Sequence, residues 1–141
     1  MPELTVDRII QNFEILGNWE ERYRYVIDLG RKLPELDEKY KTEVNRVKGC
    51  VSNVWLITHV NDAKPPTFEF EADSDAHIVR GLVAILLAAY SGKSATEILN
   101  IDIRDIFQQL DLERHLSPSR SNGFFSMVER IQSLARAATA A

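Results

Sequence analysis

The chain has 141 residues, which predicts a single domain over residues 1–141, because one domain usually holds roughly 100 to 200 residues. Hydrophobic residues make up 45% and charged residues 27%, a composition that can bury a core and excludes disordered and collagen-like chains. With 17 Lys and Arg against 21 Asp and Glu, the net charge is −4, which disfavours binding to nucleic acid.

Two helices joined by a short loop are predicted at the start of the chain. The first lies between a cap at Thr5 and an end at Gly17, because the apolar residues between them repeat with helical spacing. The second begins at Asn18, whose spacing to Glu21 is that of a capping box, and stops at Pro34. We expect the pair to form a helical hairpin.

An antiparallel β-hairpin is predicted in the middle of the chain. Residues 42–60 are rich in β-branched and aromatic residues without helical spacing, which indicates a short strand ending near Val47 and then a long strand. Turn-forming residues follow at 61–66, and residues 67–72 alternate polar with apolar. Cys50 lies between the first two strands, so we expect it at a loop tip.

Four helices are predicted after the hairpin. Residues 76–90 are apolar on nearly all sides, which is typical of a central helix packed under a sheet. A short helix follows a capping box of Ser94 and Glu97, and another follows Asp102. The last helix is predicted to begin between residues 118 and 122. Its apolar face comprises Phe124, Met127, Val128, Ile131, Leu134 and Ala138. The elements together predict an α+β fold with a small antiparallel sheet packed against helices.

Three features predict a cytoplasmic protein that does not enter a membrane. The N-terminus lacks the basic region and the continuous apolar stretch of a secretory signal. The longest apolar run, Leu82 to Tyr90, is well short of the roughly 20 residues that span a bilayer. A single cysteine, Cys50, excludes an intramolecular disulfide.

Cys50 is the strongest candidate for chemistry in this chain. Its thiolate is the best nucleophile available, since the sequence has no Gly-rich phosphate loop and no paired catalytic motif. Gly49 allows unusual backbone angles beside the sulfur, Arg46 and Lys48 supply positive charge, and Ser52 and Asn53 offer hydrogen bonds. A lone cysteine is also often a small buried apolar residue, so these residues alone leave a purely structural role open.

The three histidines offer two further interpretations of Cys50. His59, His77 and His115 would complete four metal ligands with it, but none forms a short ligand pair, so no metal site is predicted. A Cys–His hydrolase needs one histidine near the thiol. Along a regular strand His59 would point to the opposite face from Cys50, while the other two histidines are free to approach in space.

Four groups of residues occur in an order that points to one family. They are NWEERY at 18–23 with LPEL at 33–36, VKGCVSNVW at 47–55, DSDAHIVRGL at 73–82, and HLSPSR at 115–120 with Gly123. Together these segments resemble the SufE family of sulfur-acceptor proteins over about residues 5 to 135. The second segment resembles the family's active-cysteine motif and places Cys50 at the reactive position.

The resemblance implies an α+β fold shared with IscU-type scaffolds and partnership with a cysteine desulfurase of the SufS type. Pyridoxal phosphate would belong to the desulfurase, and this chain would bind no cofactor. Cys50 would accept the terminal sulfur of the partner's persulfide in a reaction like thiol–disulfide exchange. It would thereby stimulate the desulfurase, and would pass the sulfur to an iron–sulfur scaffold of the SufB type. The chain would then be an accessory protein and not an independent enzyme.

The resemblance also implies roles for neighbours of Cys50. Gly49 would let the loop swing, Ser52 would hydrogen-bond it, and Asp75 and Arg120 match motif positions near the loop. From the residues alone, Asp75 equally suits the positive end of a helix, and Arg120 an ordinary surface cation.

Two functional alternatives and the oligomeric state stay open. The chain is either a sulfur-transfer protein or, as alternatives, a thiol-independent interaction module or a Cys–His hydrolase. The sequence also leaves a homodimer open.

Overall fold

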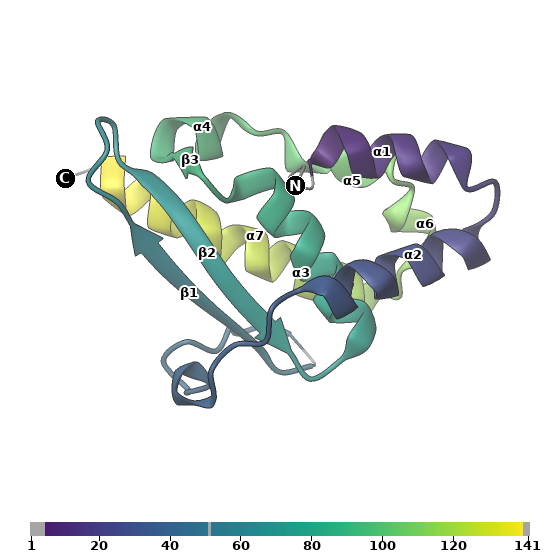
Figure 1. Ribbon diagram of the computed structural model, residues 1–141, viewed down its shortest axis with the longest axis horizontal. Coiled ribbons are helices and arrows are strands. Elements are labelled where there is room, and N and C mark those ends of the chain that lie inside the picture. The colour runs from purple at the N-terminus through teal and green to yellow at the C-terminus, as the bar shows by residue number, and fades with distance from the viewer. Residues whose placement is uncertain (1–4, 51, 140–141) are drawn as a thin grey trace.

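The computed structural model describes residues 5–50 and 52–139, and within them it shows an α+β fold (Figure 1). A three-stranded antiparallel sheet packs against helices, as the sequence predicted. Helices form the two ends of the described chain, and the sheet is formed mainly by its middle. Val51, part of the cysteine motif, lies outside the described residues.

The predicted helical hairpin is confirmed as α1 (Val6–Ile15) and α2 (Trp19–Lys32). The hydroxyl of Thr5 accepts from the N–H of Arg8, and the side chain of Asn18 accepts from that of Glu21, so both predicted caps form. The side chain of Arg22 on α2 hydrogen-bonds to the backbone at the end of α1. Its Nε donates to the carbonyl oxygens of Phe13 and Leu16, which lie at the end of α1 and lack partners within the helix.

The predicted β-hairpin is formed by β1 (Val54–Val60) and β2 (Thr67–Ser74), which pair antiparallel. The predicted short strand ending near Val47 was wrong, because only one isolated bridge, between Arg46 and Trp55, forms there. A two-residue strand, β3 (Lys93–Ser94), pairs with the other edge of β2 and was not predicted. Two residues are too few to show an alternating pattern.

The core lies between the sheet and two helices. The central helix α3 (His77–Tyr90) packs against α2 and β2, and α7 (Pro118–Thr139) runs behind the sheet (Figure 1). Along α7 the predicted apolar face is largely confirmed, but Ala138 is exposed and Ala135 is buried in its place. The start of α7 falls at the beginning of the predicted interval.

Three short helices connect α3 to α7. In α4 (Ala95–Asn100) both bonds of the predicted Ser94 and Glu97 capping box form, and α5 (Ile103–Gln109) is capped by Asp102 as predicted. The single turn α6 (Leu112–His115) and the 3₁₀ helix η1 (Glu38–Tyr40) were not predicted. Elements this short carry no periodicity that a sequence pattern can reveal.

Candidate functional site

Cys50 lies in the loop that leads into β1. Just before this loop the chain lies beside β1, and the N–H of Val47 donates to the carbonyl oxygen of Val54 over 2.8 Å. Cys50 is half-buried, and its Sγ lies 3.5 Å from the carbonyl oxygen of Gly123 on α7. The expected position in a loop is therefore confirmed, and the thiol faces a helix that is far away in the sequence.

Gly49 is required for two separate reasons. Its φ of +92° lies in the left-handed region that side chains disfavour. A Cβ built on it would also lie 2.5 Å from Oγ of Ser126 on α7. The loop can therefore turn and rest against α7 only with a glycine at this position.

Asp75 anchors the other end of the loop. Its two carboxylate oxygens accept from the backbone N–H and side-chain Nδ2 of Asn53, over 3.1 and 2.9 Å. The hydroxyl of Ser74 donates to the carbonyl oxygen of the same asparagine over 2.7 Å. The N-cap of α3 is Ala76, which has no capping side chain, so Asp75 binds the loop and does not cap the helix. The sequence predicted that Asn53 offers a hydrogen bond, but it did not identify Asp75 as the partner.

The other two predicted site residues have fewer contacts. Ser52 is half-buried, and its hydroxyl bonds to no residue that the structure describes. Arg120 is exposed on the first turn of α7, one turn before Gly123. Its backbone N–H donates to the hydroxyl of Ser117, while its guanidinium forms no ion pair within residues 5–50 and 52–139. The roles of Ser52 and Arg120 remain predictions.

Two opposing effects set the acidity of the thiol. Burial raises the pKa of Cys50 above the ordinary value for a thiol, and the positive charge of Arg46 partly opposes this. The Arg46 guanidinium is itself held by Glu43, over 2.8 and 3.0 Å. At neutral pH most molecules of the isolated protein therefore carry the protonated thiol.

Removing the charge of Arg46 should make the thiol less reactive at neutral pH. In an Arg46→Met variant the pKa of Cys50 rises further, so less thiolate is present and alkylation slows by about twofold to fivefold. The measurement is the rate of iodoacetamide labelling against pH, whose midpoint should move to higher pH. Arg24→Met, which removes an exposed cation on α2, serves as control and should leave the midpoint in place.

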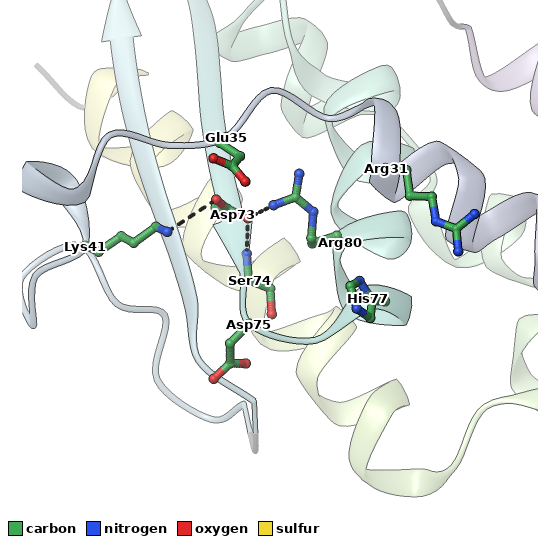
Figure 2. Close-up of a pocket in the computed structure, with 8 residues that line it drawn as sticks. All are labelled: Arg31, Glu35, Lys41, Asp73, Ser74, Asp75, His77 and Arg80. Atoms are coloured by element: carbon green, nitrogen blue, oxygen red, sulfur yellow. Dashed lines mark hydrogen bonds and ion pairs between the residues drawn. The ribbon is translucent and has the colours of Figure 1, made fainter.

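A cleft of about 340 Å³ lies beside the anchored end of the loop, and Figure 2 shows its lining. It is lined by Arg31, Glu35, Lys41, Asp73, Ser74, Asp75, His77 and Arg80. Asp73 is 1% exposed and forms an ion pair with Arg80, while Nζ of Lys41 lies 3.7 Å from its carboxylate. The cleft therefore contains a network of charged side chains around the buried Asp73, which immediately precedes Ser74 and Asp75 in the sequence.

The Asp73 and Arg80 pair joins three segments of the chain. The Asp73 carboxylate accepts from the N–H of Leu36 over 3.1 Å, and Arg80 donates to the carbonyl oxygens of Gly30 and Leu33 over 3.1 and 2.6 Å. The end of α2 is thereby fixed to β2 and α3. Sequence reasoning did not identify this network, which fixes the strand end that anchors the Cys50 loop.

The three histidines lie in three different surroundings, and none of them is hydrogen-bonded to the thiol. His59 lies 2.7 Å from Glu71 on the exposed face of the sheet, His115 stacks on Trp19 with ring centroids 4.2 Å apart, and His77 lines the cleft. The parity argument for His59 does not apply, because the strand begins only at Val54. The hydrolase alternative needs a histidine within reach of Sγ, and none is hydrogen-bonded to it.

The described residues contain neither a candidate metal-binding cluster nor a helix that could cross a membrane. Within residues 5–50 and 52–139 no group of three His, Cys, Asp or Glu side chains is arranged to hold a metal ion. In the same part of the chain no helix is both long and apolar enough to cross a bilayer.

The site and fold define an α+β protein with one half-buried thiol on a loop held between β1, β2 and α7. Comparison with known sequences identifies the family: the sequence profile described as "SufE: Fe-S metabolism associated domain" matches residues 7–135. The chain therefore belongs to the SufE family, and this membership supports a role in the sulfur chemistry of Fe-S metabolism.

Curated relatives of similar length agree. An uncharacterized SufE-like protein of Rhizobium meliloti is 55% identical over 130 residues, which cover 92% of this chain and 93% of that protein. One of Rhizobium etli is 54% identical over 138 residues, covering 97% and 93%. The solution structure of a hypothetical protein from Thermus thermophilus shares the fold with a TM-score of 0.75 at 19% identity, over 96% of each chain.

Proposed function

We propose that the protein accepts sulfur from a cysteine desulfurase onto Cys50 and delivers it to an iron–sulfur scaffold. One observation supports the proposal: the single thiol is half-buried on a loop that turns at Gly49, and among the residues that the structure describes no base is bonded to it. A hydrolase needs an adjacent base. A sulfur acceptor needs only a thiol that a partner can reach and that solvent reaches poorly.

The proposed transfer is a displacement at sulfur. The Cys50 thiolate attacks the terminal sulfur of the partner's cysteine persulfide, and a new sulfur–sulfur bond forms on Cys50 as the old one breaks. The partner's cysteine leaves as a thiolate, so no external oxidant or reductant is required. The pyridoxal phosphate that generates the persulfide belongs to the desulfurase, of the SufS type. This chain contributes the acceptor thiol.

The half-buried position suits the second step of the proposal. A persulfide on Cys50 would lie against Gly123 on α7, where bulk thiols such as glutathione reach it poorly. The scaffold, of the SufB type, would then receive the sulfur by a second displacement of the same kind. Because the transfer removes the terminal sulfur from the partner's persulfide, it would also raise the turnover of the desulfurase.

Mass spectrometry tests the proposal directly. After incubation with a desulfurase, pyridoxal phosphate and cysteine, the peptide that contains Cys50 should gain the mass of one or more sulfur atoms. Treatment with a reductant should remove the gain. A matched incubation without cysteine serves as control. A peptide that stays unmodified while the desulfurase carries its own persulfide would contradict the transfer.

A further inference from the structure

Arg130 on α7 binds the segment that leads into the Cys50 loop. Its Nη2 lies 3.1 Å from the carbonyl oxygen of Val44, and its Nη1 lies 3.5 Å from that of Arg46. The bonds join residues 86 and 84 positions apart in the sequence. They therefore connect α7 to residues 44–47, the segment that leads into the Cys50 loop.

Two backbone carbonyl oxygens, those of Val44 and Arg46, face the guanidinium of Arg130. The carbonyl oxygen of Asn45 and the N–H of Val47 are both hydrogen-bonded to β1. Arg46 forms an antiparallel bridge with Trp55, and its own carbonyl points away from β1. Val44 lies in the turn at residues 43–45, and its carbonyl oxygen faces the same guanidinium. A guanidinium is a rigid fork of donors that serves both carbonyls at once, whereas a lysine is a single point of charge.

One face of α7 contacts both the tip of the loop and the segment that enters it. Gly123, Ser126 and Arg130 follow each other at helical spacings of three and four residues, so they lie on the same side. Gly123 accepts from the Cys50 thiol, and Ser126 lies against Gly49. The tip of the loop and the segment entering it are therefore held by the same stretch of helix.

We propose that Arg130 is a positioning residue for the acceptor thiol, which keeps residues 44–47 on α7 and thereby keeps Cys50 against Gly123. Without the two hydrogen bonds of Arg130, residues 44–47 can leave α7. A larger fraction of the molecules then has an exposed Cys50 thiol. The importance of this shelter for sulfur transfer rests on the proposed function. The position of the loop itself is a property of the isolated chain.

Alkylation of Cys50 by iodoacetamide, in the absence of any desulfurase, tests this role. We expect Arg130→Met to react about tenfold faster than the parent, because two hydrogen bonds to a charged donor are lost. Arg130→Lys keeps the charge and one donor group, so its rate should lie between the two. Arg136→Met removes an arginine on the same helix that binds Glu129 and Ser133, and should react like the parent.

Hydrogen exchange separates local opening from general unfolding. In Arg130→Met the amides of Val47 and Leu56, which bond between the loop approach and β1, should lose protection. The amides in the middle of α3 should keep theirs. The proposal is overturned if Arg130→Met is alkylated at the parent's rate, or if its faster alkylation comes with equal loss of protection throughout α3.

The two proposals fail in different ways. If Arg130→Met exposes Cys50 but the parent never gains sulfur from a desulfurase, the proposed function fails and the positioning role stands. If sulfur reaches Cys50 in the parent while all arginine variants are alkylated at one rate, the positioning role fails and the proposed function stands.

Discussion

A Cys50→Ser variant will fold like the parent protein and will fail to stimulate a cysteine desulfurase. The replacement is nearly isosteric, and the bond of the thiol to the carbonyl oxygen of Gly123 is one that a hydroxyl can also make as a donor. A hydroxyl does not attack a persulfide at neutral pH and cannot hold sulfane sulfur. Release of sulfide from cysteine in the presence of a reductant should therefore fall to the rate of the desulfurase alone.

Controls separate lost chemistry from lost binding. Ser133→Ala removes one exposed hydroxyl on α7 that bonds to Glu129 and not to the loop, and should stimulate like the parent. An excess of Cys50→Ser should reduce stimulation by the parent, because it still occupies the partner. Equal stimulation by Cys50→Ser and the parent would contradict sulfur transfer through Cys50 and would favour the thiol-independent interaction module.

An Asp73→Asn variant will lose a large part of the protein's stability. The Asp73 side chain is 2% exposed and that of Arg80 is 15% exposed, so the substitution leaves a nearly buried cation without its counter-charge. Breaking such a pair from one side typically costs about 3 to 5 kcal/mol, out of a total of about 5 to 15 kcal/mol for a domain. Urea unfolding followed by circular dichroism gives the free energy of unfolding.

An exposed pair provides the matched control. Asp28→Asn removes the same charge from an ion pair with Arg31, in which the side chains are 56% and 71% exposed. Its cost should be below about 1 kcal/mol. If Asp73→Asn costs no more than Asp28→Asn, the network is not a stabilising element of the fold.

Local signals in the sequence identified most of the elements. Caps at Thr5, Asn18, Ser94 and Asp102 act through residues three positions away, so they can be read along the chain and all form. The hairpin was equally clear from its alternation and turn residues. The motif predicts Cys50 as the acceptor, which stays a prediction, while its place in a loop is confirmed.

The parts of the site that were not predicted depend on distant contacts. Asp73 accepts from Leu36, 37 positions away, and Arg130 binds residues more than 80 positions away. No periodicity or spacing encodes such pairs, because they exist only once helices and sheet have packed. Asn53 was predicted to offer a hydrogen bond, but its partner Asp75 lies 22 positions away and was not identified.

The bond between Cys50 and Gly123 has a consequence for protein synthesis. Because 73 residues separate the two, the loop leaves the ribosome long before the helix that shelters it. At about 5 to 20 residues per second the delay is roughly 4 to 15 seconds. During that interval every nascent chain presents an uncovered thiol to the cell. Oxidation of Cys50 should therefore fall mainly on unfinished chains, because the thiol becomes protected only when α7 is complete.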